Sequence, residues 1–455
     1  MSKMKINRWI VLTFILLLPL AGVNAGSLTH VLFTEGGTGA TSTVFREGLA
    51  THIGGATQTL DIAIYNLTDP TTIAAIKTVA AKGVKVNVFT DGENNEAGDK
   101  MQTSLAGTAN VTIKSDGTNG DEMHHKFVIV DAAIAGGASV FTGSANFTTT
   151  GLTTQNNNAI IVLDDAFAKS YKEEFDRLFV SGLTHQSKGT TGKSHTMDDG
   201  TVLEVRFAPG TGSNSTLTAL NDVITASTKS FYYAIYTFGT IQISNTMIAN
   251  KAVSNFGWFD KKQANFVSTS FNNLAAAGLS VTKSPVPVMH HKYLVSDVAT
   301  VVMGSANFTA AADSKNDENQ VIIKNNTTIA QLYVKELNRI ASQTLETLGT
   351  NTLTDTTITN ATTTTTVTTT TSSTSPNGEI RQGPNPVRLG SGSMTFTSAQ
   401  AGLIKKIEIY DMSGRLVHTI APSSLTATEI TWDGRNNQGG FLGSGMYFYR
   451  AVGTS

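Results

Sequence analysis

HHKFVIVD at residues 124–131 is followed by GSAN at residues 143–146, and HHKYLVSD at residues 290–297 is followed by GSAN at residues 304–307. Two copies that share this many positions do not arise by chance. Cleavage of a phosphodiester through a covalent intermediate needs two histidines, one to attack phosphorus and one to protonate the departing oxygen. The duplication therefore predicts two related halves, each of which supplies one histidine to a shared site.

The turn before GSAN is longer in the first copy, because more residues separate Asp131 from Gly143 than separate Asp297 from Gly304. We place the extra residues in a hairpin turn, where added length costs little, and expect the site to be intact. The two glycines are expected to allow a close backbone approach or a positive φ. The two aspartates are expected to secure a strand end rather than to act directly.

Strand alternation divides the side chains of each copy between two faces. A period of two puts His124 and Lys126 on one face and His125 on the other. The corresponding residues of the second copy are His290, Lys292 and His291. We expect the first histidine of each pair to be catalytic, because it recurs with all its partners, and the second to pack or to act indirectly.

A phosphodiester anion must be held while attack spreads more charge over its oxygens. Lys126 and Lys292 supply positive charge at the predicted site. The expected neutral donors are Ser144, Asn146, Ser305 and Asn307. Preorganised donors of this kind need no metal. The chain has no cysteine, its nine histidines show no metal-ligand spacing, and no metal or cofactor is predicted.

These motifs resemble the H-x-K-D and G-S-x-N signature of the phospholipase D superfamily, over about residues 27–345. The resemblance implies an α/β fold of two similar halves around a pseudo-twofold axis, with the site at their interface. It also implies a phosphohistidine intermediate, which water hydrolyses or an alcohol captures.

The superfamily often places a carboxylate eleven positions after the Asn of the motif, where it orients a histidine. Glu318 stands there in the second half and Asn157 in the first. A carboxylate partner favours the imidazolium that a general acid needs, whereas an amide leaves its histidine neutral. With each residue assigned to the histidine of its own half, we expect His124 to be the nucleophile and His290 the acid.

Apolar strands alternate with helical patterns at Thr71–Lys82 and Phe167–Phe179, which predicts mixed sheets covered by helices. We place the two halves at residues 27–184 and 201–346. The polar segment Ser181–Gly200 is expected to link them.

Residues 1–25 combine basic residues, an apolar run and a small-residue cleavage site, as in a secretory signal peptide. Residues 347–376 are mostly Thr, Ser and Asn and predict a linker without a packed core. Residues 377–455 resemble the Ig-like β-sandwich of flagellar hook-capping proteins and the sorting domains of type IX secretion. The protein is therefore expected to be secreted or held at the cell surface. The C-terminal domain is either a contact for secretion machinery or a spacer.

Charge bears on the substrate. Removal of the three basic residues of the signal peptide takes the formal charge from −1 to −4, whereas proteins that grip nucleic acid usually carry excess Lys and Arg. We therefore predict hydrolysis of phospholipid at a membrane surface to phosphatidate and a free head-group alcohol. The alternatives are a metal-independent secreted endonuclease with the same residues, a phosphatidyltransferase, and a surface-binding protein with an inactive relic of the fold.

Overall fold

The computed structural model describes residues 26–347 except 35–41, 94–103, 118–119, 187–191, 213–214 and 285–287. Nearer the C-terminus it describes residues 380–383, 394–398, 404–410, 416–421, 429–433, 435–439 and 448–453. The expected signal peptide and nearly all of the expected linker lie outside these residues. The chain divides into two compact units, one with both halves of the repeat and one with the C-terminal strands. None of the described helices is long and apolar enough to cross a membrane.

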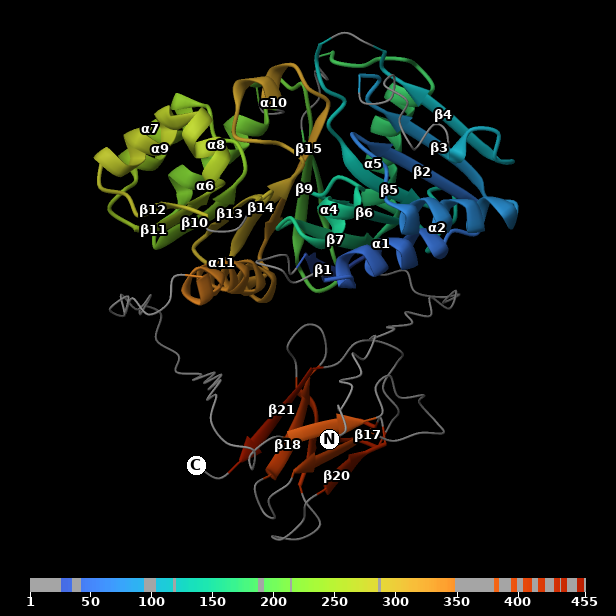
Figure 1. Ribbon diagram of the computed structural model, residues 1–455, viewed down its shortest axis with the longest axis vertical. Coiled ribbons are helices and arrows are strands. Elements are labelled where there is room, and N and C mark those ends of the chain that lie inside the picture. The colour runs from blue at the N-terminus through green and yellow to red at the C-terminus, as the bar shows by residue number, and fades with distance from the viewer. Residues whose placement is uncertain are drawn as a thin grey trace, which may run out of the picture. The chain divides into compact units, whose positions relative to one another are not determined.

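The first half contains a seven-stranded mixed sheet in the order β1-β7-β6-β5-β2-β3-β4 (Figure 1). Its strands are β1 (Ser27–Phe33), β2 (Thr59–Ile64), β3 (Lys85–Thr90), β4 (Val111–Ser115), β5 (Lys126–Val130), β6 (Ser139–Gly143) and β7 (Asn158–Leu163). Strands β2, β3 and β4 run parallel, and the remaining pairs are antiparallel. The extra residues of the first copy lie in the turn of the β5–β6 hairpin, as expected.

The second half repeats this order with one added strand, as β12-β11-β10-β13-β14-β15-β9-β8. Its strands are β8 (Lys193–Thr196), β9 (Val202–Ala208), β10 (Ser230–Ile235), β11 (Ser254–Phe259), β12 (Val281–Lys283), β13 (Lys292–Ser296), β14 (Thr300–Gly304) and β15 (Glu318–Lys324). The added strand β8 belongs to the segment that we expected to be only a link, and it pairs with β9 at the sheet edge. The expected α/β halves are confirmed.

Helices cover both sheets on their outer sides and also fill the space between them. The helices are α1 (Val44–Gly54), α2 (Pro70–Ala81), α4 (Thr149–Thr153), α5 (Asp165–Phe179), α6 (Thr216–Ala226), α7 (Ile241–Ala249), α8 (Lys261–Phe266), α9 (Ser268–Ala276), α10 (Ala310–Ser314) and α11 (Thr327–Thr347). Helices α1, α2 and α4 pack on the first sheet and α6 to α9 on the second (Figure 1). Helices α5 and α11 share one core with the inner faces of both sheets. This common core fixes one half against the other.

Two parallel bridges join the halves beside the predicted site, between Met123 and Asp317 and between Asn156 and Met289. The backbone N–H of His124 donates to the carbonyl of Asp317 at 2.9 Å, and that of His290 donates to the carbonyl of Asn156, also at 2.9 Å. Each catalytic candidate is therefore tied to the segment that precedes the closing strand of the opposite half.

The two motif glycines stand where the backbone admits no side chain. A Cβ atom on Gly143 would lie 2.1 Å from the carbonyl oxygen of Asn158, and one on Gly304 would lie 2.3 Å from that of Asn319. Gly304 also has a φ of 149°, which disfavours other residues. The expected close approach occurs at both glycines, and the positive φ only at Gly304.

The C-terminal unit consists, where it is described, of two three-stranded antiparallel sheets. One contains β16 (Ile380–Gly383), β17 (Met394–Ser398) and β20 (Glu429–Trp432), and the other β19 (Leu416–Ile420), β18 (Ile404–Tyr410) and β21 (Phe448–Gly453). Strands β18 and β19 form an antiparallel pair. These strands agree with a small all-β module.

Candidate active site

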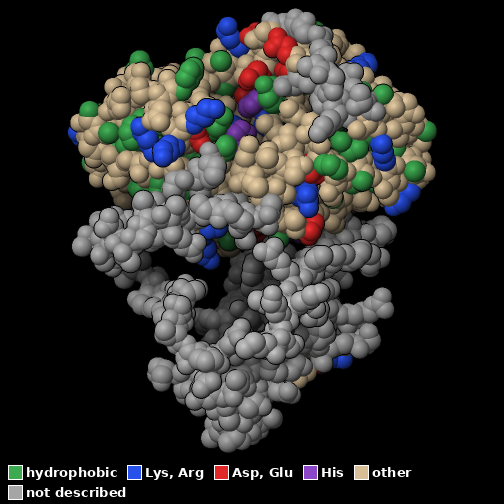
Figure 2. All heavy atoms as spheres, in the orientation of Figure 1, with side chains coloured by type: hydrophobic (Ala, Val, Ile, Leu, Met, Phe, Trp, Pro, Cys, Tyr) green, Lys and Arg blue, Asp and Glu red, His purple; other side chains and the backbone are tan. Residues whose placement is uncertain are grey.

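The two His-Lys pairs lie at the ends of the central strands β5 and β13, where the halves meet. His124 and His290 are 5% and 7% exposed, while Lys126 and Lys292 are almost completely buried. Histidine side chains are visible between the halves, beside acidic groups, on the face of the molecule that Figure 2 shows. The structure thus brings the two predicted pairs together in one partly accessible site.

The partner of each histidine comes from the opposite half. Nδ1 of His124 lies 2.7 Å from Oε1 of Glu318, and Nδ1 of His290 lies 2.9 Å from Oδ1 of Asn157. We had assigned each partner to the histidine of its own half, and that assignment is wrong. The backbone bridges between the halves set each histidine beside the other half's closing strand.

The motif serines bond to these partners of the histidines. The hydroxyl of Ser305 donates to Oε2 of Glu318 at 2.5 Å, and that of Ser144 donates to Oδ1 of Asn157 at 2.8 Å. Because a hydroxyl has a single proton, the expectation that the serines donate to phosphate is wrong. Each serine instead fixes the group that holds a histidine.

The orientation of Asn157 defines the tautomer of its histidine. Its Nδ2 donates to the carbonyl of Gly151 at 2.9 Å, so its Oδ1 is the acceptor for His290. The proton on Nδ1 of His290 leaves Nε2 available for chemistry, and the Glu318 carboxylate selects the same tautomer of His124. Both histidines therefore carry an unprotonated Nε2, and Nε2 of His290 lies 3.3 Å from Nζ of Lys292.

Each lysine is held by the backbone of its own histidine and by an aromatic ring. Nζ of Lys126 donates to the His124 carbonyl at 2.8 Å and lies 5.1 Å from the ring centroid of Tyr65. In the second half, Nζ of Lys292 donates to the His290 carbonyl at 3.0 Å and lies 5.0 Å from the ring centroid of Tyr236. These contacts aim both ammonium groups while leaving N–H donors for an anion.

The two tyrosines were not expected from the sequence, although they occupy matching positions near the ends of β2 and β10. The Tyr65 ring lies 4.9 Å from the His124 ring, and the Tyr236 ring lies 4.6 Å from the His290 ring, measured between centroids. They form aromatic walls beside the reacting histidines.

Burial and positive charge govern ionisation at the site. Burial lowers the pKa of both His124 and His290 well below the ordinary value, and both site lysines lower it further. Burial also lowers the pKa of Lys126 to about 8 and that of Lys292 well below its usual range. Burial raises the pKa of Glu318 to about 7, opposed by Lys126 and by the Ser305 hydroxyl. A bound phosphodiester anion would stabilise the charged lysines and histidines.

The two motif asparagines remain candidates for contact with substrate. Asn146 and Asn307 are both partly exposed. Oδ1 of Asn307 accepts the N–H of Thr237 at 3.3 Å, which turns its amide N–H groups away from that backbone. Their expected role as neutral donors stays a prediction.

The motif aspartates hold the turns that lead into β2 and β10. Asp131, 4% exposed, accepts the N–H groups of Thr57, Gln58 and Thr59 and the Thr57 hydroxyl. Asp297 makes the corresponding bonds with Thr228, Lys229 and Ser230. Both aspartates secure the ends of β5 and β13 against the neighbouring strands β2 and β10, as we expected. Their role in the motif is therefore to position the strands that carry the histidines and lysines.

The second histidine of each motif pairs with a helix glutamate that the sequence analysis missed. Nε2 of His125 lies 3.0 Å from Oε1 of Glu174 on α5, and Nε2 of His291 lies 2.8 Å from Oε1 of Glu336 on α11. Both glutamates belong to a repeated Glu-x-x-Arg pattern, which is the sequence signal that would have found them. Buried histidine–glutamate hydrogen bonds thus anchor the central strands to the inner helices.

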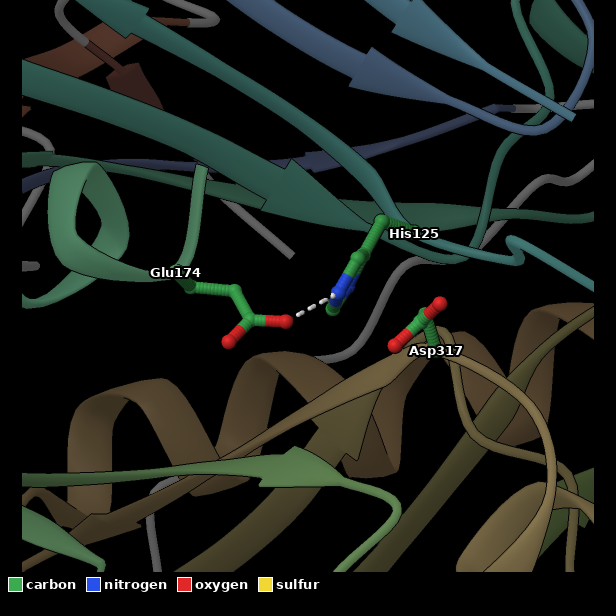
Figure 3. Close-up of side chains that lie close together, drawn as sticks. All are labelled: His125, Glu174 and Asp317. Atoms are coloured by element: carbon green, nitrogen blue, oxygen red, sulfur yellow. Dashed lines mark hydrogen bonds and ion pairs between the residues drawn. The ribbon is translucent and has the colours of Figure 1, made fainter. Parts of the chain in front are cut away.

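One group of described residues has the spacing of metal ligands, namely His125, Glu174 and Asp317. Figure 3 shows Glu174 reaching the His125 ring from α5, with Asp317 nearby on the opposite half. The carboxylate of Asp317 also accepts the backbone N–H of His185 at 3.0 Å, and Nδ1 of the His185 ring lies 3.3 Å from the same carboxylate. Nε of Arg177 lies 3.7 Å from Oε2 of Glu174, so basic protein groups already lie beside both carboxylates.

Two such α/β halves, with an H-x-K pair from each at their junction, agree with a PLD-like domain in two parts. The chain belongs to the family described as "Cardiolipin synthase, PLD-like domain", which matches residues 49–179 and 220–341, more than half of the chain. Residues 387–455 match the FlgD Ig-like domain, so the resemblance of the C-terminal region is also confirmed.

Curated relatives match parts of the chain. A mitochondrial cardiolipin hydrolase of Xenopus tropicalis is 32% identical over 124 residues, which cover 27% of this chain and 56% of the relative. A phospholipase D of Rickettsia conorii is 40% identical over 76 residues, 16% of this chain and 38% of the relative. The chain thus spans about half the length, or less, of these relatives.

Among solved structures, the phosphatidylserine synthase of Haemophilus influenzae Rd KW20 aligns with a TM-score of 0.54 at 13% identity. The alignment covers 70% of this chain and 88% of that one. At this identity the likeness concerns the fold alone, and it agrees with the two-half architecture.

Proposed function

We propose that this chain is a phospholipase D that hydrolyses phospholipids to phosphatidate and a free head-group alcohol. The observation that carries the proposal is the crossed pairing, in which Glu318 and Asn157 each hold Nδ1 of a histidine and leave Nε2 available. Two imidazoles and two ammonium groups then converge where a phosphodiester anion would bind.

In the first step, Nε2 of His124 attacks phosphorus and the bond from phosphorus to the head-group oxygen breaks. Protonated His290 gives its Nε2 proton to that departing oxygen. In the second step, His290 takes a proton from water, whose oxygen attacks phosphorus as the bond from phosphorus to His124 breaks. Lys126 and Lys292 hold the phosphoryl oxygens throughout, and the products are phosphatidate and the alcohol.

His124 is the better nucleophile because its partner is the Glu318 carboxylate. Phosphorylation of Nε2 leaves a positive charge on an imidazole whose Nδ1 is protonated, and the Glu318 carboxylate stabilises that charge. Nδ1 of His290 has the neutral Asn157 as partner, and the Lys292 ammonium lies 3.3 Å from both ring nitrogens, so the His290 imidazolium is the better proton donor. The carboxylate therefore supports the intermediate rather than the acid.

Phospholipid is favoured as substrate by two observations. The matched relatives are named cardiolipin hydrolase and phospholipase D, and the chain has no overall excess of positive charge. Nucleic acid is the alternative substrate, and an alcohol in place of water in the second step would make the enzyme a phosphatidyltransferase.

We also propose that the protein is exported, with residues 1–25 removed and the Ig-like domain serving at the cell surface or in secretion. The basic, apolar and small-residue pattern of the N-terminus and the match to the FlgD Ig-like domain support this. N-terminal sequencing of the protein recovered from the culture medium and from cells tests it, because an intact Met1 on the exported protein contradicts removal.

The substrate is tested by head-group release from phosphatidylcholine and phosphatidylethanolamine vesicles, beside nicking of plasmid DNA, all in EDTA. Wild type and His124→Ala are compared. Lipid turnover that the variant loses supports the phospholipase. DNA nicking without lipid turnover overturns it in favour of the nuclease, and silence on both substrates returns the chain to a binding role.

The roles of the histidines are tested with His290→Ala and two classes of ester. A p-nitrophenolate leaves without a proton, so His290→Ala is expected to retain the first step on a p-nitrophenyl phosphodiester and to accumulate phosphate on His124. A head-group alkoxide needs the acid, so lipid turnover should be lost. Phosphate recovered on His290 from wild-type enzyme after rapid quenching reverses the assignment.

A further inference from the structure

An exposed basic and apolar surface lies next to the site on the second half. Phe266, at the end of α8, is 86% exposed, and Ile241, at the start of α7, is 54% exposed. Lys261, Lys262 and Lys283 are also exposed. We call these five residues the α8 patch. Large exposed apolar side chains ringed by cations are uncommon on a surface that meets only water.

The α8 patch is one continuous surface. Cβ on Gly239, two residues before Ile241, would lie 3.4 Å from Val267, which follows Phe266. Nζ of Lys283 donates to Oδ1 of Asn265 at 2.6 Å, beside Phe266 in α8. Contacts between α7, α8 and α9 therefore bring together residues that are distant in sequence.

Local charge sets this region apart from the rest of the chain. Residues 241–283 contain four lysines and one acidic residue, Asp260, although the whole chain has a formal charge of −1. Asp260 is buried and caps α8 through the N–H of Gln263, so it does not neutralise the surface. Figure 2 shows basic and hydrophobic side chains over α7 to α9, on the face where histidine side chains are visible between the halves.

Hydrogen bonds couple the α8 patch to the site. Nε2 of Gln263, in α8, donates to the Tyr236 hydroxyl at 3.1 Å, and the Tyr236 ring packs against His290. The Thr237 hydroxyl donates to Oε1 of the same glutamine at 3.3 Å, while the Thr237 N–H bonds Asn307. A surface that engages α8 would therefore lie beside the mouth of the site.

We propose that the α8 patch docks the enzyme on a bilayer that contains anionic phospholipid, with Phe266 and Ile241 inserted and the lysines at the headgroups. Apolar insertion and electrostatic attraction add up at such an interface. An aliphatic residue beside the phenylalanine favours the acyl boundary over nucleotide bases, which stack on aromatic rings. The reason for docking on a bilayer rests on the proposed phospholipid substrate. The docking itself is tested independently, because vesicle binding and lipid turnover are measured separately.

The test measures flotation with vesicles of phosphatidylcholine and phosphatidylglycerol in the His124→Ala background, so that lipid is not consumed. Phe266→Ser and the pair Lys261→Glu and Lys262→Glu are each expected to weaken binding roughly tenfold or more, from the loss of a buried Phe or of two lysines near the surface. Added salt should weaken binding of the parent protein and have less effect on the charge-reversed pair.

Matched controls carry the same changes on the first half. Val180→Ser removes another exposed apolar side chain, and Lys77→Glu with Lys82→Glu reverses two exposed lysines, one in α2 and one directly after it. The α8 patch substitutions are also made in the enzyme that keeps His124. These variants should hydrolyse bis(p-nitrophenyl) phosphate at the wild-type rate, which shows that the fold and the site are intact.

Loss of vesicle binding in the α8 patch variants but not in the controls supports the proposal, even if the enzyme turns over no phospholipid. Equal binding by all variants overturns it. A loss of affinity for single-stranded DNA with vesicle binding unchanged also overturns it, and assigns the α8 patch to nucleic acid.

Discussion

Nδ1 of His124, in the first half, lies 2.7 Å from the carboxylate of Glu318, in the second half, while Nδ1 of His290 lies 2.9 Å from the amide oxygen of Asn157. The site is therefore symmetric in shape and asymmetric in charge. A carboxylate stabilises the histidine that becomes cationic in a covalent intermediate, and the neutral amide leaves the other as the stronger acid. One substitution in a duplicated fold has thus differentiated two otherwise equivalent histidines.

Exchanging the two partners tests this asymmetry. Glu318→Gln should lower kcat by about 10- to 100-fold, the usual scale for a residue that orients a reacting group. The double variant Glu318→Gln with Asn157→Asp moves the carboxylate to His290, and phosphate trapped by rapid quenching should shift toward that histidine. Asn157→Asp alone is the matched control, and trapping that stays on His124 in the double variant contradicts the argument.

The activity should decline as pH rises. Burial and the two ammonium groups lower the pKa of His290, so its acid form is lost as pH increases through that lowered value. Lys126, with a pKa of about 8, is charged below that pH and loses the charge that binds phosphate above it. The profile of kcat/KM for lipid should therefore fall on the alkaline side.

Lys126→Arg separates the two contributions, because a guanidinium stays charged at all these pH values. The part of the decline near pH 8 should disappear in this variant. A p-nitrophenyl ester, which needs no acid, should lack the part due to His290. An alkaline decline that neither change alters speaks against both attributions.

Asp131→Ala should destabilise the fold rather than abolish chemistry directly. It removes the acceptor of three partly buried backbone N–H groups and one hydroxyl, and each such hydrogen bond contributes about 0.5–1.5 kcal/mol. We expect a loss of about 3 kcal/mol in the free energy of unfolding, measured with urea. Asp297→Ala is the matched variant, and an inactive but fully stable Asp131→Ala would show a direct role.

Gly143→Ala should damage both stability and turnover. Its Cβ would lie 2.1 Å from the Asn158 carbonyl oxygen, so β6 and β7 must separate beside Ser144. A cost of about 1–3 kcal/mol is expected from such overpacking. Gly54→Ala is the control, since its Cβ meets nothing within 4 Å and helix α1 should gain stability. Equal melting temperatures for the two variants would count against the close approach.

Turnover should persist in EDTA. The groups that would hold the phosphoryl oxygens are the ammonium groups of Lys126 and Lys292, whose charges repel a metal cation from the same position. Rates with EDTA, with and without added Mg²⁺ or Zn²⁺, should agree within about twofold on the soluble ester. A strict metal requirement, restored by one ion, would falsify this account of phosphate binding.

Much of the architecture follows from local patterns. The period-two alternation around Lys126 and Lys292 set their side chains on the face of the catalytic histidines, and the duplicated motifs predicted two halves with one site. The resemblance to the phospholipase D superfamily also marked Glu318 and Asn157 as orienting residues. The role of Ser144 and Ser305 could not be predicted, because a hydroxyl's single proton is committed only once its neighbours are known.

The sequence by itself determined the chemistry, since motif residues in fixed local spacing place an imidazole and an ammonium group side by side whatever surrounds them. Only the tertiary structure decided which half completes which histidine. His124 bonds the backbone of Asp317, and His290 that of Asn156, so each histidine receives its partner from the other half. Distance along the chain cannot encode that exchange, because it arises from packing two sheets against one core around α5 and α11.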